Sequence, residues 1–450
     1  MLKSGHKKFQ IKGILYTLRL ILALFGIVAV VVLLVMKKET KTVLIGVGLI
    51  LCLLCLKPMN AFGAFTEYMT KAGLIKAICA SMGFAFVMKY TKCDKQLVNA
   101  LTLPMKNIGF LLIPFTMFLT YLINIAIPSA AGCSAAVGAT LIPLLMASGV
   151  RPAMAGAAVF AGTFGGVLSP GSAHNIFITD MVKATNPLYT VQDVIKVQFQ
   201  SAVISLVIVL IMISIMALIL KDYSKGRNYL LDATNSKSTS ENSEKINPFH
   251  ALMPIVPLVI LIIGGTSLNK ISFLTWTKMG VAEAMILGAV ITIIVTLTNP
   301  EKITKEFFNG MGSAYANIIG IIIAAGVFVA GLSACGAIDF VISWLKNDQS
   351  FVKFGGTFVP FIMGVVTGSG DAAAFAFNQA VTIHANDLGF AQDKLGMAAA
   401  ISGALGRSAS PIAGACIVCA GLAGVNPIEI AKRTALGMFL SVCAIAFFVL

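Results

Sequence analysis

Two charged residues lie within stretches of the chain that are otherwise apolar. Arg407 is the only charged residue between Ala398 and Ala423, and Asp371 directly precedes an apolar run of alanines and phenylalanines. A guanidinium can bind a carboxylate through two parallel hydrogen bonds, and a carboxylate can bind a cation or a proton. Because ionisable groups in apolar segments are costly, the two residues predict a site for a charged small molecule. A structural ion pair between them is the alternative.

Further polar side chains occur where apolar segments are interrupted by glycine or proline. Ser408 and Ser410 follow Arg407, and His174 and Asn175 follow the sequence Ser-Pro-Gly-Ser at 169–172. Hydroxyl groups can donate hydrogen bonds to an anion. His174 and Asn175 are candidates for lining the site, and a purely structural role for them is an equal alternative.

The elements that must position these residues are membrane helices. Of the 450 residues, 58% are hydrophobic and 11% are charged, whereas soluble domains carry about 25% charged residues. Apolar runs such as 13–36 and 201–220 are long enough to cross a bilayer, and roughly ten to twelve crossings or re-entrant segments account for the length. No alternating strand pattern is present. The sequence predicts an all-α polytopic membrane protein, and it argues against a soluble enzyme.

The net charge of +15 does not indicate a nucleic-acid partner. The basic residues stand in short loops and at segment ends, for example Lys3, Lys7 and Lys8 before the first span and Lys221 after a later one. This distribution is typical of cytoplasmic loops. We expect a bacterial inner-membrane protein with a cytoplasmic N-terminus, whose first span is retained as an anchor because it is too long for a signal-peptide core.

The nine cysteines predict neither a metal site nor a cofactor. Cys52 and Cys55, like Cys416 and Cys419, lie in apolar runs without a nearby histidine. Zinc and redox motifs require polar, loop-borne surroundings. We therefore expect these cysteines to pack among apolar side chains.

A polar segment divides the chain into two halves that resemble each other. The predicted divisions are 1–220 with the anchor and a first repeat, a cytoplasmic linker at 221–250, and a second repeat at 251–450. Three landmarks recur at offsets of 240, 241 and 240 positions: Ser129 with Ser369, Ser169 with Ser410, and Asn186 with Asn426. This agreement predicts a duplication, and paired interruptions of this kind indicate a transporter binding site.

Each half contains two kinds of interruption. The small-residue tips at 129–132 and 367–370 predict a chain reversal within the membrane, because glycine allows backbone angles that other residues resist. The Ser-Pro steps at 169–170 and 410–411 predict a discontinuous helix, because proline lacks a backbone N–H. Such breaks are tolerated at membrane depth where protein or a watery cavity satisfies the backbone. A packed kink is the alternative at each site.

The charges are confined to one half of the duplicated scaffold. Subtracting the offsets places Ala131 opposite Asp371 and Gly166 opposite Arg407. Binding an asymmetric substrate and ion requires such an asymmetry, whereas a symmetric scaffold does not.

A protease and a channel are two other functions that a chain of this kind could have. The sequence Gly-Ser-Gly-Asp at 368–371 matches the pattern of intramembrane aspartyl proteases, which need a second membrane aspartate. Asp339 is the nearest candidate, but it lacks the expected context, and the matching first-half tip has no acid. The protease interpretation is therefore disfavoured. A channel is the third option, which the sequence separates poorly from a carrier.

Three stretches of the second half resemble the anaerobic four-carbon dicarboxylate carriers of the DcuC type, within the ion transporter superfamily. They are 310–336, 366–377 and 405–434, and a looser similarity covers most of 60–440. The resemblance implies uptake, efflux or exchange of fumarate, succinate and malate by symport or antiport. It also implies inverted repeats, each with a re-entrant hairpin and a discontinuous helix, an elevator-type movement and a homodimer in the lipid bilayer.

The resemblance also implies a set of site residues. Substrate contacts are expected at Ser129, Ser134, Ser169, Ser172, Thr367, Ser369, Arg407, Ser408 and Ser410. Ion coupling, to sodium or protons, is expected at Asp371, Gly132 and Gly370. The family often has Asn at the position of Asp371, so this carboxylate is a departure. A carboxylate there would change the coupling ion or admit a cationic or neutral substrate. A carrier of another small organic anion or of an amino-acid-like substrate is the alternative to a dicarboxylate carrier.

Overall fold

The computed structural model describes residues 2–36, 38–102, 109–225, 227–229, 247–265, 272–345 and 349–450. Residues 226 and 230–246, most of the predicted linker, lie outside the described residues. Within the described ranges the regular elements are all helical, and the only β-type pairing is an isolated bridge between Val150 and Tyr223. The predicted all-α class is confirmed.

Seven helical segments of the described chain are long and apolar enough to cross a membrane. They are Tyr16–Leu34, Gly109–Ala126, Ala130–Ala147, Pro152–Lys183, Val191–Ile219, Pro300–Ala334 and Pro427–Phe448. Shorter apolar helices accompany them. The chain is therefore a multi-pass membrane protein.

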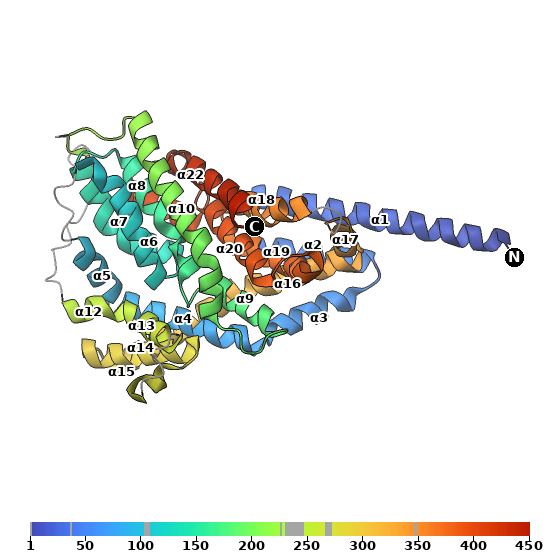
Figure 1. The fold of residues 1–450 in the computed structure, drawn as a ribbon, viewed down its shortest axis with the longest axis horizontal. Coiled ribbons are helices and arrows are strands. Elements are labelled where there is room, and N and C mark those ends of the chain that lie inside the picture. Colours follow the sequence, from blue (N-terminus) through green and yellow to red (C-terminus); the bar gives the residue numbers. More distant parts are fainter. Residues whose placement is uncertain are drawn as a thin grey trace.

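The first half begins with a long helix that extends away from the bundle, with the N-terminus at its far end (Figure 1). This helix is α1 (Leu2–Val35), and it is followed by α2 (Thr40–Leu54), α3 (Pro58–Met69), α4 (Ala72–Tyr90) and α5 (Cys93–Thr102). The remaining helices of this half are α6 (Leu112–Ala126), α7 (Ala130–Ala147), α8 (Pro152–Ala161) with its 3₁₀ continuation η3 (Gly162–Leu168), α9 (Ala173–Lys183) and α10 (Val191–Ile219).

The second half contains the remaining helices. It starts with α12 (Pro248–Leu252), α13 (Val256–Gly265), α14 (Val281–Thr296), α15 (Pro300–Ala314), the π-helical turn η7 (Tyr315–Ile319), α16 (Gly320–Ala334) and α17 (Ala337–Leu345). It continues with α18 (Gln349–Thr367), α19 (Gly370–Ala380), α20 (Gln392–Arg407), α21 (Gly414–Ala423) and α22 (Pro427–Phe448).

The predicted interruptions coincide with helix ends. The tip at Ser129 separates α6 from α7, and the tip at Ser369 separates α18 from α19. Each serine caps the helix that follows: Ser129 accepts a hydrogen bond from the Gly132 amide (3.2 Å), and Ser369 accepts one from the Ala372 amide (3.3 Å). The two Ser-Pro steps likewise separate η3 from α9 and α20 from α21.

Helix packing is reciprocal between the halves. Helix α4 packs against α14 and α15, and α16 packs against α2 and α3. Similarly, α8 packs against α22, and α20 packs against α10. Each such pair of contacts is what a duplication around an internal two-fold axis would produce.

One close approach also occurs in both halves. A Cβ atom on Gly165 would lie 2.1 Å from the carbonyl oxygen of Tyr121, and a Cβ on Gly406 would lie 2.1 Å from the carbonyl oxygen of Phe361. Only glycine permits these backbones to approach so closely. The contacts hold α6 against η3 and α18 against α20.

Helices α10 and α22 lie side by side within the helix bundle (Figure 1). Ser441, late in α22, lies beside Ser205 at the middle of α10. Arg433, early in α22, binds Asp222, which lies just beyond the end of α10. The two helices are therefore antiparallel.

Two apolar cores meet around the candidate site. One joins α6, α7, α8 and α10 to α20, α21 and α22. The other joins α4 and α9 to α14, α15 and α16. Cys52, Cys55, Cys416 and Cys419 are buried and unbridged, as the sequence predicts.

Candidate functional site

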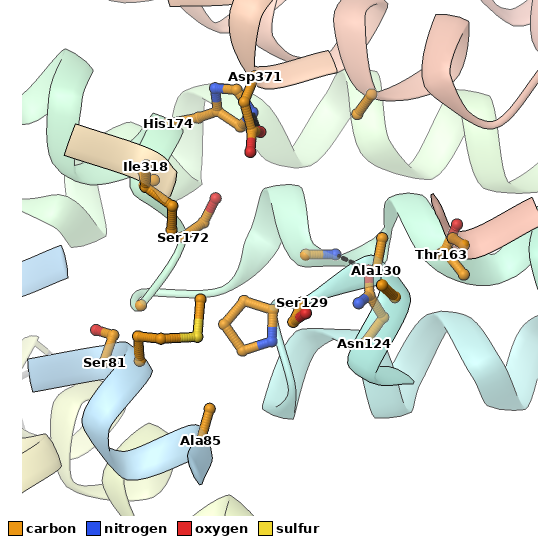
Figure 2. Close-up of a pocket in the computed structure, with 18 of the residues that line it drawn as sticks. Ser81, Ala85, Asn124, Ser129, Ala130, Thr163, Ser172, His174, Ile318 and Asp371 are labelled. Carbon is orange, nitrogen blue, oxygen red and sulfur yellow. Dashed lines mark hydrogen bonds and ion pairs between the residues drawn. The ribbon is translucent and has the colours of Figure 1, made fainter. Parts of the chain in front are cut away.

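A cavity of about 270 Å³ lies where the two halves meet. Figure 2 shows side chains from both halves around it. Its polar lining consists of Ser81 on α4, Asn124 and Ser129 at the first tip, Thr163 on η3, Ser172 and His174 at the start of α9, Asp371 on α19, and Arg407 at the end of α20. Five of the predicted site residues are thereby brought together: Ser129, Ser172, His174, Asp371 and Arg407.

Arg407 is held by the first half of the chain. Its Nη2 donates to the backbone carbonyl of Thr163 (3.0 Å), and its Nη1 donates to the Thr163 hydroxyl oxygen (3.3 Å). That hydroxyl donates in turn to the Phe160 carbonyl (2.8 Å). As the last residue of α20, the guanidinium also lies at the negative end of its own helix dipole. Thr163 thus fixes the cation at the edge of the cavity.

Asp371 is paired with His174 across the two halves. The Nε2 atom of His174 lies 2.7 Å from Oδ1 of Asp371. The histidine is buried and its ring lies 4.9 Å from that of Phe375, whereas the Asp371 side chain is 44% exposed. Figure 2 shows the two side chains together at one end of the cavity. The side chain that contacts the Asp371 carboxylate in the described structure is therefore His174, and the alternative of an Arg407–Asp371 pair is not observed.

The first tip is fixed by an amide that sequence reasoning missed. Asn124 Nδ2 donates to the Ile127 carbonyl (2.9 Å), and its Oδ1 accepts from the Gly166 amide (2.6 Å). The latter bond is drawn in Figure 2. Asn124 therefore ties the tip to Gly166 of η3, the residue that corresponds to Arg407 in the duplication. A lone Asn in an apolar run four residues before Pro128 was the available signal.

Thr163 and Ser81 were also missed. Thr163 lies in a Gly-rich apolar stretch, where threonine is unremarkable. The Ser81 hydroxyl donates to the carbonyl of Ala77 in its own helix (2.9 Å), a contact that gives no sequence signal of a site.

The remaining predicted residues lie outside the cavity lining. Ser134 is buried within α7. Ser408 follows Arg407 and is also buried, with its Oγ 3.4 Å from the Thr163 hydroxyl. The Ser410 hydroxyl donates to the Val365 carbonyl (2.7 Å), while the Thr367 hydroxyl accepts from the Ser369 amide (3.1 Å).

Asn175 and Ser169 support the break in the first half. Asn175 Nδ2 donates to the carbonyls of Val167 (2.9 Å) and Ser169 (2.8 Å), which satisfies backbone oxygens freed at the break. Gly132 and Gly370 lie in the first turns of α7 and α19. Their assigned part in ion coupling stays a prediction.

Four helix N-termini converge on the cavity, two from each half. Residues in the first turns of α7, α9, α19 and α21 all line it. The N-termini of α7 and α19 are capped by Ser129 and Ser369, but the residues that precede α9 and α21 make no side-chain cap. Uncapped N-terminal N–H groups carry a partial positive charge and bind anions. The cavity therefore offers an anion two uncapped N-termini and a guanidinium, together with one exposed carboxylate.

Comparisons with known proteins identify the family of the chain. The family of C4-dicarboxylate anaerobic carriers matches residues 60–450. An uncharacterized transporter of Haemophilus influenzae is 51% identical over 287 residues, which are 63% of this chain and 100% of that protein. The anaerobic C4-dicarboxylate transporter DcuC of Escherichia coli K12 is 25% identical over 370 residues, covering 80% of this chain and 76% of its own.

A solved structure shares the fold. MtrF of Neisseria gonorrhoeae, described as illuminating a class of antimetabolite efflux pumps, superposes with a TM-score of 0.60 at 13% identity, covering 87% of this chain and 83% of that one. At this identity the likeness concerns the fold alone. The match over residues 60–450, which is most of the chain, shows that this protein belongs to the C4-dicarboxylate anaerobic carrier family, whose members are transporters rather than enzymes.

Proposed function

We propose that this protein is a secondary transporter of C4-dicarboxylates such as fumarate, succinate and malate across the bacterial inner membrane. The observation that carries the proposal is the pair of uncapped N-termini of α9 and α21, which open onto one cavity beside Arg407. A dicarboxylate has an anionic group at each end. One carboxylate can accept N–H bonds at a helix N-terminus while the other meets the guanidinium.

The size of the cavity supports a small substrate. About 270 Å³ lies just below the roughly 300–1,000 Å³ typical of pockets for drug-sized ligands. Four-carbon acids are well below drug size, whereas a peptide or lipid would not fit. A cavity between paired breaks is also the arrangement expected of a carrier rather than an open pore.

The proposed mechanism is an elevator-type movement of the hairpins and broken helices against a scaffold formed by α2–α5 and α13–α17. In this proposal the two repeats are inverted, the N-terminus is cytoplasmic and the protein is a homodimer. The reciprocal packing of the two halves and the antiparallel course of α10 and α22 support the inversion. Transport would proceed by exchange or by ion-coupled symport.

One observation favours a second candidate substrate class. The Asp371 carboxylate is 44% exposed, with only one of its oxygens at the 2.7 Å contact with His174. An ammonium group could bind the other oxygen, so an amino acid with an additional carboxylate would satisfy Asp371 and Arg407 together. Aspartate, which is both an amino acid and a four-carbon dicarboxylate, is the natural probe.

The test is counterflow in vesicles reconstituted with the purified protein. Vesicles loaded with unlabelled succinate should take up labelled succinate from outside, and unlabelled fumarate, malate or aspartate should compete. Competition by aspartate that exceeds that by malate would favour the second candidate. An absence of counterflow for every organic acid tried would contradict the carrier proposal.

A further inference from the structure

His174 and Asp371 form a contact that anion binding by itself does not require. The two residues come from different halves, on α9 and α19, and their 2.7 Å contact places a titratable ring against a carboxylate at the cavity wall. A carboxylate beside an anion site weakens anion binding through like-charge repulsion. The carboxylate therefore needs a role that offsets this disadvantage.

The histidine is held from one side only. Its Nε2 faces Asp371, while Nδ1 is buried and has no hydrogen-bond partner among the described residues. A structural histidine usually has its second ring nitrogen fixed by a carbonyl or carboxylate, which selects one protonation state. No such partner selects the state of His174. The ring and the carboxylate are also in direct contact, so a proton bound by either group lies within hydrogen-bond distance of the other.

The other groups that line the cavity make the charge of the pair decisive for the charge of the lining. The described lining contributes the guanidinium of Arg407 from α20, the neutral hydroxyls of Ser81 from α4 and Thr163 from η3, and Ile318 from η7. With His174 neutral and Asp371 ionised, the formal charges of Arg407 and Asp371 cancel. One added proton brings the pair from −1 to 0 and the cavity lining from 0 to +1.

We propose that the His174–Asp371 pair is a proton-binding site that couples proton uptake to anion binding in this cavity. The inference rests on the proposed function of anion transport and identifies the coupling ion as the proton. By linkage, a bound proton increases the affinity for a dianion, and a bound dianion increases the affinity for the proton by the same factor. Because the pair also joins α9 to α19, a change in its protonation affects a contact between the two halves.

Two substitutions should fix the pair in opposite states. His174→Gln keeps an N–H donor toward Asp371 but cannot take up a proton, so the pair stays at −1. Asp371→Asn fixes the charge of the pair at 0 above neutral pH. Fumarate is the appropriate probe because it remains a dianion near neutral pH.

The measurement is fumarate affinity as a function of pH in sodium-free buffer, with counterflow measured in parallel. Wild-type affinity should fall as the pH rises, by a factor in the usual range for coupled sites of roughly 5- to 150-fold. His174→Gln should show weak affinity at every pH, and Asp371→Asn should show tight affinity at every pH above neutral. His384→Gln, in η8 (Thr382–Leu388) and outside the cavity lining, is the matched control and should keep the wild-type profile.

A second measurement needs no variant. Adding fumarate to the lightly buffered wild-type protein should cause proton uptake from the medium, which a pH indicator reports. A wild-type pH profile in either variant, or fumarate binding without proton uptake, would overturn the proposal of a proton-binding pair. Counterflow by the wild-type protein would still support the transporter function in that case. If counterflow itself is absent, the proposed function fails independently of the proton measurement.

Discussion

At the scale of single residues, the two charged side chains that the second half contributes to the cavity are each held by the first half. Arg407 donates to Thr163, and Asp371 contacts His174, so the two charges do not neutralise each other directly. Opposite charges held apart in this way remain available to a ligand, whereas a direct pair would consume the donors of the guanidinium. Residues of the first half thus bind the charged residues that occur only in the second half of the duplication.

Arg407→Lys is expected to weaken dicarboxylate binding sharply. Lysine keeps the charge, but it loses the planar fork that binds Thr163 and a carboxylate at the same time. Loss of one charge-assisted contact costs about 1.5–3 kcal/mol, or roughly ten- to a hundredfold in affinity. Succinate counterflow at graded concentrations measures the effect.

The control for this prediction is Lys196→Ala, a change at an exposed lysine of α10 that lies outside the cavity lining. It should leave counterflow near the wild-type level. Unchanged succinate affinity in Arg407→Lys would remove Arg407 from the substrate site.

The sequence predicted the charged residues of the site better than their partners. Arg407 and Asp371 are conspicuous because charges in apolar runs are rare, and both line the cavity. The His174–Asp371 contact joins residues 197 positions apart, and no local pattern specifies such a pairing. Thr163 and Asn124 were missed because a neutral polar residue in an apolar helix often satisfies its own backbone instead of a ligand.

At the scale of helices, the matched glycines Gly165 and Gly406 set how closely neighbouring helices approach. At each glycine, an added Cβ would lie 2.1 Å from a carbonyl oxygen of the adjacent helix, which is α6 for Gly165 and α18 for Gly406. The carbonyl belongs to the backbone and cannot rotate away as a side chain can. Both contacts position the helix breaks that surround the cavity.

Gly406→Ala is expected to destabilise the protein by about 1–3 kcal/mol, the usual effect of overpacking, because α18 and α20 must separate. The matched control is Gly421→Ala in α21, where an added Cβ would meet nothing within 4 Å. The control should be neutral or slightly stabilising, since alanine favours the helix. Thermal unfolding followed by size-exclusion chromatography compares the two variants, and equal melting temperatures would contradict the predicted close contact.

A buried ion pair fixes the ends of α10 and α22 together. Arg433 donates to Asp222 through Nε (2.7 Å) and Nη2 (3.0 Å), and Asp222 is fully buried. A buried pair adds little net stability compared with apolar residues, but removal of one partner leaves an uncompensated charge. A substitution of one partner is therefore expected to lower the stability of the protein far more than a substitution of both partners.

Arg433→Met should lower the stability by about 3–5 kcal/mol, because Asp222 remains buried without the guanidinium that pairs with it. The double variant Arg433→Met with Asp222→Asn should recover part of this loss. Lys432→Met, the same change at the adjacent exposed residue, is the control and should have little effect. A loss in the double variant as large as in the single one would show that packing of the arginine, not charge, is responsible.

Helix boundaries were predicted where the chain carries strong local signals. Proline at a Ser-Pro step and serine at a small-residue tip act on the backbone within a few residues, so the breaks at 129, 169, 369 and 410 could be placed from the sequence. The short 3₁₀ continuation η3 and the π-helical turn η7 could not, because tertiary packing selects them. Which break residues face the cavity also depends on packing, and Ser172 lines it whereas Ser169 does not.

At the scale of the whole molecule, the antiparallel course of α10 and α22 bears on membrane topology. These helices occupy matching places in the two halves, and both are long and apolar enough to cross a bilayer. If both cross it, the halves have opposite orientations. Basic residues agree with this arrangement, because Lys221 follows the end of α10 and Lys432 lies near the adjoining start of α22. That shared end is expected to be cytoplasmic.

The corresponding prediction uses two exposed positions that are 240 residues apart. Leu188 precedes α10 and is 88% exposed, and Ile428 lies at the start of α22 and is 51% exposed. In a variant without the nine native cysteines, Leu188→Cys should react with a membrane-impermeant maleimide added to intact cells, because the start of α10 lies on the periplasmic face of an inverted protein. Ile428→Cys should react only after the membrane is opened, because the start of α22 lies beside the basic cytoplasmic end of α10. Both cysteines must react fully in detergent, which controls for burial. Labelling of both positions from the same side of the intact membrane would contradict inverted repeats, and the elevator-type movement that depends on them would then lose its structural basis.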